Sequence, residues 1–341
     1  MELTERIVPF TAGDGMALNL INIRSAAHPP TLGPVILVHG AGVRANIFRA
    51  PEKETIVDAL VNAGYDVWLE NWRASIDFPA NTWNLDQAAL YDHPKAVQKI
   101  CEETGHATLK AIIHCQGSTS FMMSAVAGLV PQVTTIIANA VTLHPVVPAW
   151  SRFKLNFVVP LVNVFTPYVN PHWGVEAPNW IAKIMTALVK LTHHECNNTV
   201  CKWVSFTYGS GFPALWRHEN ISENTHEWLK EEFGNVPMRF FKQMARCVHK
   251  GHLVAVEGYP ELPDDFGLMP PKTDARFSFF CGGKNRCFLP ESQEKSWAYF
   301  DKLKPNFHTL HRLPEYSHLD IFMGKHAARD VFPIMIEELA K

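Results

Sequence analysis

The stretch that decides the fold is Ala111-Ile112-Ile113-His114-Cys115-Gln116-Gly117-Ser118-Thr119. Its first part is a run of β-branched and apolar residues, which is typical of a buried strand. Residues 121–129, which follow, have a composition compatible with a helix. A strand, a sharp turn and a helix in this order would present one reactive side chain at the turn, that of Cys115.

The turn at Cys115 is similar to the nucleophile elbow G-x-S-x-G, with cysteine at the serine position. Gly117 occupies the second glycine position of the motif. Ile113 occupies the first, where a small residue is usual because the turn crowds the strand before it. Since most free cysteines are simply small buried hydrophobic residues, the motif is weak by itself.

Composition narrows the possible functions. The chain has 341 residues, of which 47% are hydrophobic and 19% charged, enough for a large core in one domain with an insertion. The formal net charge is -2 and the basic residues are scattered, so we expect no nucleic-acid partner. The apolar residues 155–169 are interrupted by Pro160 and Pro167 and are too few to span a bilayer, so we expect no membrane insertion.

The cysteines and the N-terminus predict a cytoplasmic protein without metal. Residues 1–10 carry Glu2 and Glu5 and do not resemble a signal peptide. Seven cysteines form an odd set, which favours reduced thiols. No C-x-x-C pair occurs, and the adjacent His193 and His194 would point in different directions, so we expect no zinc site.

Strands and helices alternate along most of the chain, which predicts an α/β fold with a mostly parallel sheet flanked by helices. The predicted strands are 7–11, 16–23, 34–38, 65–69, 111–114, 134–140, 276–281 and 307–313. The predicted helices are 51–63, 95–104, 121–129, 179–192, 240–248 and a closing helix that ends at Lys341.

The alternation stops between residues 147 and 269, where Trp, Phe, Pro, His and Asn become frequent. We therefore predict a core made of residues 1–146 and 270–341, and a mainly helical cap over 147–269. An aromatic insertion after a core strand is typical of a cap over an active site. A dimer surface is the alternative.

Two loops add candidate polar groups. His39-Gly40-Ala41-Gly42 follows the strand 34–38, so the N–H of Ala41 could face a developing oxyanion together with that of Gln116. A tight turn between strand and helix would explain the same glycines. His318 lies in the loop after the last strand. Asn71 and Arg73 are expected to brace the elbow.

Four blocks in this order resemble the α/β-hydrolases of the group that contains acid lipases and polyhydroxyalkanoate synthases: His39-Gly40, residues 64–73, residues 114–118 and His318-Leu319-Asp320. The chain is also similar to hydrolase-like regions attached to flavin-dependent GMC-type oxidoreductases, in which a cysteine nucleophile is familiar. This second resemblance implies association with a flavin oxidoreductase.

The resemblance implies that Cys115 is the nucleophile and His318 its base, with oxyanion N–H groups from Ala41 and Gln116. The family places a carboxylate where this chain has Asn285. A thiolate paired with an imidazolium depends less on that carboxylate, so a Cys-His-Asn site is expected. The alternatives to Asn285 are Asp320 and Glu291.

These residues predict an acyl-transfer enzyme without a cofactor. The preferred activity is hydrolysis of hydrophobic esters or thioesters through an acyl-thioester on Cys115. An acyltransferase or cyclase of the polyhydroxyalkanoate-synthase kind is one alternative. A non-catalytic partner protein on a hydrolase scaffold is the other, and Ile113 and Asn285 are its best arguments.

Overall fold

The computed structural model describes residues 2–211 and 214–341. Its main feature is an eight-stranded sheet with the order β1-β2-β4-β3-β5-β6-β9-β10. These strands are β1 Thr4–Thr11, β2 Ala17–Arg24, β3 Pro34–Val38, β4 Asp66–Asn71, β5 Leu109–His114, β6 Val133–Asn139, β9 Arg276–Gly282 and β10 Thr309–Leu313. Strand β2 is antiparallel to β1 and β4, and the pairs from β4 to β10 are parallel, which confirms the predicted fold class.

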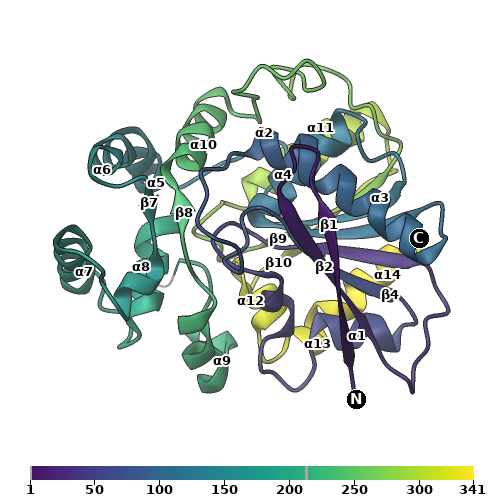
Figure 1. Ribbon diagram of the computed structural model, residues 1–341, viewed down its shortest axis with the longest axis horizontal. Coiled ribbons are helices and arrows are strands. Elements are labelled where there is room, and N and C mark those ends of the chain that lie inside the picture. Colours follow the sequence, from purple (N-terminus) through teal and green to yellow (C-terminus); the bar gives the residue numbers. More distant parts are fainter. Residues whose placement is uncertain (1, 212–213) are drawn as a thin grey trace.

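Helices cover both faces of this sheet. Figure 1 shows α3, α4 and α11 on one side, and α1, α13 and α14 on the other. The helices of this layer are α1 Ile56–Asn62, α2 Leu85–Gln87, α3 His93–Thr104, α4 Cys115–Val126, α11 Glu291–Leu303, α12 Asp320–Met323, α13 Ala327–Asp330 and α14 Phe332–Ala340, with a 3-10 helix η1 Ala45–Arg49 and a π-helix η2 Ala88–Asp92. Central strands such as β3 are therefore buried along their whole length.

The predicted helix 51–63 is shorter in the structure. Helix α1 begins only at Ile56, because Thr55 and Asp58 form a capping box that satisfies the first N–H groups of the helix. The chain before Thr55 turns instead. The periodicity of apolar residues does not show where this helix begins. The capping residues mark its first residue.

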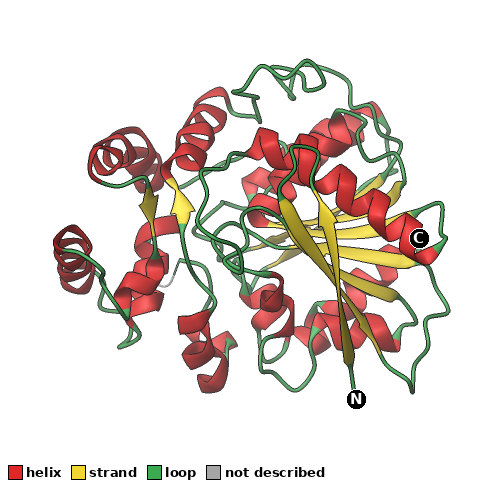
Figure 2. Ribbon diagram, in the orientation of Figure 1, coloured by secondary structure: helices red, strands yellow, loops and turns green. Residues whose placement is uncertain are grey.

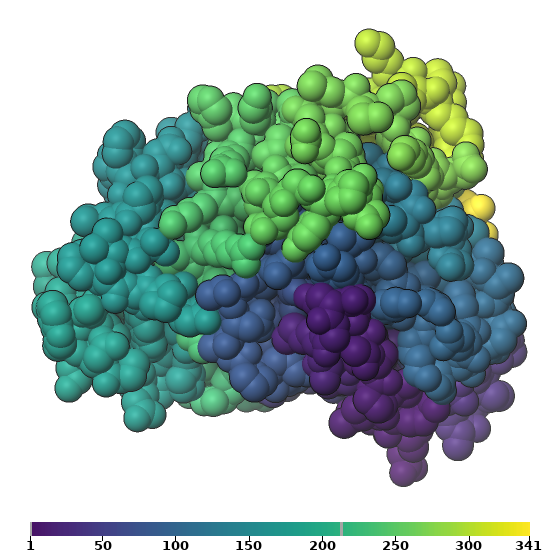
Figure 3. All heavy atoms as spheres, turned by 45° about the horizontal axis from the view of Figure 1, so that its top comes forward, coloured from purple at the N-terminus to yellow at the C-terminus, as the bar shows by residue number. Residues whose placement is uncertain are grey.

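The segment between β6 and β9 is mainly helical. It contains α5 Ala149–Phe153, a π-helix η3 Lys154–Val158, α6 Val159–Phe165, η4 Pro171–Gly174, α7 Trp180–Thr192, α8 Thr199–Tyr208, η5 His218–Asn220, α9 Glu223–Trp228, η6 Leu229–Glu231 and α10 Met238–Lys250, with the strand pair β7 Tyr168–Val169 and β8 Val236–Pro237. Figure 2 shows these helices grouped beside one end of the sheet, and Figure 3 shows their atoms as a teal and green lobe. Among the described residues, no helix is both long and apolar enough to cross a bilayer.

A buried ion pair supports the loop after β4. The guanidinium of Arg73 donates to Asp92 at 2.6 Å and to Asp14 at 2.9 Å, and the side chains of Arg73 and Asp92 are 3% and 0% exposed. The side chain of Asn71 accepts the backbone N–H of Ala45. Asn71 and Arg73 therefore hold neighbouring loops in place. The turn beside Cys115 is instead contacted by Trp72, whose Nε1 donates to the carbonyl of His39 at 2.9 Å.

Candidate active site

Cys115 lies at the junction of β5 and α4. Its φ is +55°, a left-handed conformation that a non-glycine residue adopts only when the surrounding structure holds it there. The turn passes very close to the neighbouring loop, because a Cβ added at Gly117 would lie 2.2 Å from the carbonyl oxygen of His39. Gly117 is therefore required at its predicted motif position.

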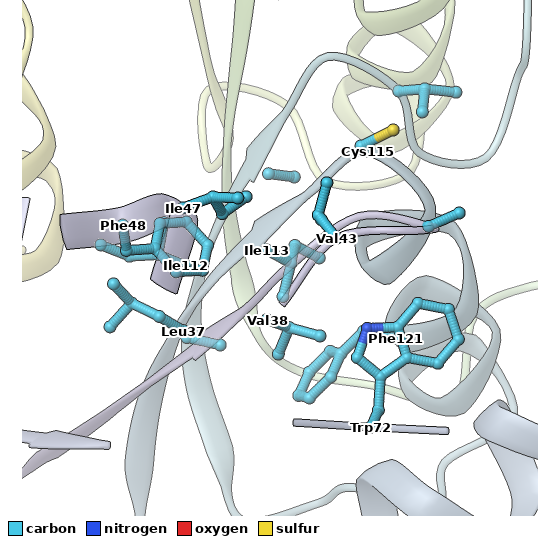
Figure 4. Packing of buried hydrophobic residues seen from close by; sticks show 14 of the residues in the cluster. Leu37, Val38, Val43, Ile47, Phe48, Trp72, Ile112, Ile113, Cys115 and Phe121 are labelled. Atoms are coloured by element: carbon cyan, nitrogen blue, oxygen red, sulfur yellow. The ribbon is translucent and has the colours of Figure 1, made fainter. Parts of the chain in front are cut away.

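Ile113 does not prevent this elbow. Its side chain is fully buried, and it pairs with Val38 in the sheet. Figure 4 shows Ile113 pointing into the apolar core near Val38 and Val43, while Cys115 lies above them at the start of the helix. The side chain of Ile113 fills a volume of the core that a glycine at this position would leave empty.

Two backbone N–H groups face the sulfur of Cys115. They belong to Ala41 and Gln116, the two residues expected at an oxyanion hole. Burial raises the pKa of the Cys115 thiol to about 12, although both N–H groups act to lower it. The structure thus brings a thiol and two backbone donors together at the carboxyl end of β5.

His318 approaches the same sulfur from the loop between β10 and α12. The sulfur of Cys115 and one ring nitrogen each of His114 and His318 lie within 4.8 Å of one another. The loop packs tightly on the end of β9, since a Cβ added at Gly282 would lie 1.9 Å from the carbonyl oxygen of Ser317. His114, whose ring centroid is 4.7 Å from that of His318, is a neighbour that the sequence did not reveal.

Asn285 contacts the ring of His318, and its amide is oriented by the backbone. Its Oδ1 accepts the N–H groups of Cys287 and Phe288 at 2.9 and 3.1 Å. Its Nδ2 therefore points to Nδ1 of His318, at 3.1 Å. Because an amide nitrogen only donates, Nδ1 accepts, and the proton of the neutral ring lies on Nε2.

This arrangement corrects one expectation. Burial lowers the pKa of His318 to about 3, while that of Cys115 is raised. The resting pair is thus a neutral thiol and a neutral imidazole, where the sequence suggested a thiolate and an imidazolium. In addition, Nε2 of His318 is buried and has no hydrogen-bond partner in the described residues.

The two alternative carboxylates lie elsewhere. Asp320 accepts the backbone N–H groups of Ser317 and Arg217 and the side-chain amide of Asn220. These bonds shape the loop that carries His318. Glu291 is exposed in the first turn of α11. Of the three candidates, Asn285 is the one that hydrogen-bonds to the ring of His318 in the described part of the chain.

A small apolar cavity of about 60 Å³ opens beside Cys115. Its walls come mainly from the helical segment between β6 and β9, including Val159, Tyr208 and Phe241. Next to it lies a second cavity of about 40 Å³, also lined by Val159 and Phe241. Both are far smaller than common ligand pockets, which are about 300–1,000 Å³. A long ligand must therefore displace side chains of this wall.

Two polar side chains in this wall were not singled out from the sequence. Lys154 is buried, and its Nζ donates to the carbonyl oxygens of Phe206 and Gly209, both at 2.5 Å. Burial lowers the pKa of Lys154 to about 8. The hydroxyl of Tyr208 donates to the carbonyl of Ala41 at 3.4 Å, which links the helical segment to the turn with the oxyanion N–H group.

The raised pKa of Cys115 makes a testable prediction. We expect the rate of alkylation of Cys115 by iodoacetamide to rise about tenfold per pH unit between pH 7 and 9, because only the thiolate reacts. Peptide mass spectrometry after timed quenching measures this rate residue by residue. The slope of the rate against pH reports ionisation of the thiol, whereas the absolute rate also depends on the access of iodoacetamide to Cys115. A rate that is already constant at pH 7 would show a low pKa and contradict the neutral resting pair.

No family model matches the chain. Lipase member K of Homo sapiens is 23% identical to it over 96% of this chain and 85% of the lipase. Sterol esterase 2 of Saccharomyces cerevisiae is 26% identical over 33% of this chain and 25% of the esterase. Among solved structures, a soluble variant of monoglyceride lipase from Saccharomyces cerevisiae has a TM-score of 0.58 at 14% identity, covering 97% of this chain and 95% of the lipase. A thermophilic esterase from Thermogutta terrifontis has a TM-score of 0.56 at 14% identity, covering 98% of both chains.

Proposed function

This chain has the α/β-hydrolase fold, and we propose that it hydrolyses small hydrophobic esters or thioesters through Cys115. One observation carries the proposal: the sulfur of Cys115 stands on a left-handed elbow and faces the N–H groups of Ala41 and Gln116. A thiol kept in a strained conformation beside two backbone donors suits attack on a carbonyl. The names of the lipases and esterases in the comparisons support this substrate class.

The proposed reaction proceeds in two steps. Cys115 gives its thiol proton to His318 as its sulfur bonds to the acyl carbon, and the carbonyl oxygen becomes an oxyanion between the two N–H groups. The bond from the acyl carbon to the alcohol or thiol then breaks, and the leaving group takes that proton from His318. Water then attacks the acyl-thioester, releases the free acid and returns the proton to Cys115. The apolar cavity favours a short hydrophobic acyl group.

The geometry of this site hinders transfer of the thiol proton from Cys115 to His318. His318 can take the thiol proton on Nε2 only if its own proton moves to Nδ1, where Asn285 presents a donor. The amide of Asn285 would then have to turn and give up its bonds from Cys287 and Phe288. We therefore expect slow turnover.

The contact between Asn285 and His318 also favours a second candidate function, which is binding of a carbonyl compound without turnover. With the proton on Nε2, His318 can donate to an oxygen atom placed near the sulfur, as Ala41 and Gln116 can. A ligand carbonyl would then accept three hydrogen bonds while the thiol stays neutral. In this case Cys115 would be a wall residue.

Intact-mass spectrometry distinguishes these functions. The wild-type chain and Cys115→Ala are exposed briefly to short and long p-nitrophenyl esters and acyl thioesters, and the released acid is quantified in parallel. We expect an acyl adduct and free acid with wild type only. Cys101→Ala, which changes a half-buried thiol in α3, should behave as wild type.

Circular dichroism must show that Cys115→Ala is folded. Equal turnover in wild type and Cys115→Ala would refute the role of Cys115. Binding of the ester without adduct or product would favour the second candidate. An adduct that persists until an amine or alcohol is added would instead show an acyltransferase.

A further inference from the structure

Four side chains with metal-binding atoms meet in the helical segment between β6 and β9, away from Cys115. They are Cys196, Cys201, His218 and His226, and one ligand atom of each lies within 4.8 Å of the other three. Cys196 precedes α8, Cys201 lies in its first turn, His218 begins η5 and His226 lies in α9. The four residues thus join parts of the chain that are 30 residues apart in sequence.

The distances within this cluster match those of a tetrahedral zinc site. The sulfur of Cys196 is 3.7 Å from Nε2 of His226, and that of Cys201 is 3.4 Å from Nε2 of His218. Zinc–sulfur bonds of about 2.3 Å and zinc–nitrogen bonds of about 2.0–2.1 Å at tetrahedral angles place S and N about 3.6 Å apart. Both histidines present the same nitrogen to the cluster. A small shift of the side chains would place all four atoms around one ion.

The backbone around the cluster is fixed by Asn198. Its Oδ1 accepts the N–H of Cys201 at 3.1 Å, and its Nδ2 donates to the carbonyl of His226 at 2.7 Å. The side chain of Asn198 therefore connects the backbone at Cys201 to the backbone at His226. Such supporting hydrogen bonds keep the ligands of metal sites in position.

A buried acidic group beside the cluster gives an independent indication of a cation. Both carboxylate oxygens of Glu195 are buried and have no hydrogen-bond partner among the described residues. A buried carboxylate without a partner is costly in free energy. A divalent ion at the adjacent cluster would attract this carboxylate, and the two thiolates of Cys196 and Cys201 would offset part of that attraction.

This part of the chain also has little apolar core of its own. The cluster of buried hydrophobic residues that joins η4, α7 and α8 contains only Trp173, Ala182, Val189 and Trp203. The inner face of α8 packs into the main core through Val200, Cys201 and Val204, so a metal would add to that packing on the outer side. A cross-link between α8 and α9 would secure the outer part of the cap.

We propose that Cys196, Cys201, His218 and His226 bind one Zn²⁺ as a closed structural site. Two thiolates and two neutral imidazoles are a set that zinc prefers, and they balance its charge once both thiols release their protons. Four protein ligands leave no position for water, so the ion stabilises the fold and takes no part in catalysis. The sequence argument against zinc considered only C-x-x-C pairs and adjacent histidines, whereas the cysteine spacing here is C-x4-C and the histidines are contributed by a different segment.

Metal analysis of the purified protein tests this proposal without any measurement of activity. We expect about one zinc per chain by inductively coupled plasma mass spectrometry after expression with added zinc and purification without chelator. Cys201→Ser and His226→Asn should each lose most of the zinc. Cys101→Ser and His106→Asn, which change the same residue types outside the cluster, should keep it.

Cobalt substitution of the wild-type chain makes the test independent of whether the variants fold. After removal of zinc, Co²⁺ should produce the visible bands of tetrahedral cobalt and a near-ultraviolet band of sulfur-to-cobalt charge transfer. The melting temperature should fall on zinc removal and return on reloading. The proposal is overturned if wild type contains no stoichiometric zinc and gives no cobalt bands, or if fresh protein contains a Cys196–Cys201 disulfide.

Discussion

Replacing Asn285 with aspartate should raise kcat/KM for ester hydrolysis by about 100-fold. One carboxylate oxygen can still accept the N–H groups of Cys287 and Phe288, and the other can accept a hydrogen bond from Nδ1–H of His318. Nε2 then becomes free to take the thiol proton. In a Ser-His-Asp triad the opposite exchange lowers kcat about 10⁴-fold because it fixes the wrong tautomer. We expect a smaller gain, about 100-fold, because a cysteine nucleophile depends less on the carboxylate than a serine does.

The matched control is Asn285→Ala, which removes the contact without supplying an acceptor. It should be no more active than wild type, and circular dichroism should show that both variants fold. The pH profile gives a further readout, because the carboxylate should raise the pKa of His318 and produce an acid limb in kcat/KM. If Asn285→Asp gained nothing while turnover still required Cys115, the assigned amide orientation would be wrong.

Replacing Arg73 with methionine should lower the free energy of unfolding by about 3–5 kcal/mol. Arg73 and Asp92 are almost completely buried, so the variant would leave the carboxylate of Asp92 without its partner in an apolar environment. The apolar stem of the side chain is retained, so the loss reports the charge and not the packing. Urea unfolding followed by circular dichroism measures the change.

Arg312→Met is the appropriate comparison for this result. Arg312 pairs with Glu294 at 3.2 Å, but their side chains are 57% and 37% exposed. A pair in water contributes little, so we expect a change below about 1 kcal/mol. Equal effects of the two substitutions would mean that burial of the Arg73 pair does not determine its contribution.

The sheet could be predicted from the sequence because its signals are local. The apolar run 34–38 coincides with β3, and the predicted strand 276–281 is one residue shorter than β9. Likewise, the positions of Cys115 and His318 follow from their place after a strand. These features depend on burial and on chain order, which a sequence records directly.

The proton arrangement of the site could not be predicted in this way. It depends on two backbone N–H groups after β9, which orient the amide of Asn285, and no pattern of residue types reports such an orientation. Similarly, Cys201 and His226 lie close together because the side chain of Asn198 bonds to the backbone of both residues. Contacts of this kind belong to tertiary structure.

The walls of the small cavity have two separate origins. Strand ends and their loops supply Cys115, Gln116 and the N–H of Ala41, whereas Val159, Tyr208 and Phe241 come from an insertion. Mutations in that segment can alter the shape of the cavity without moving the strand ends. Descendants of such a protein can therefore diverge in ligand preference by accumulating changes in one segment, while inheritance preserves the elbow.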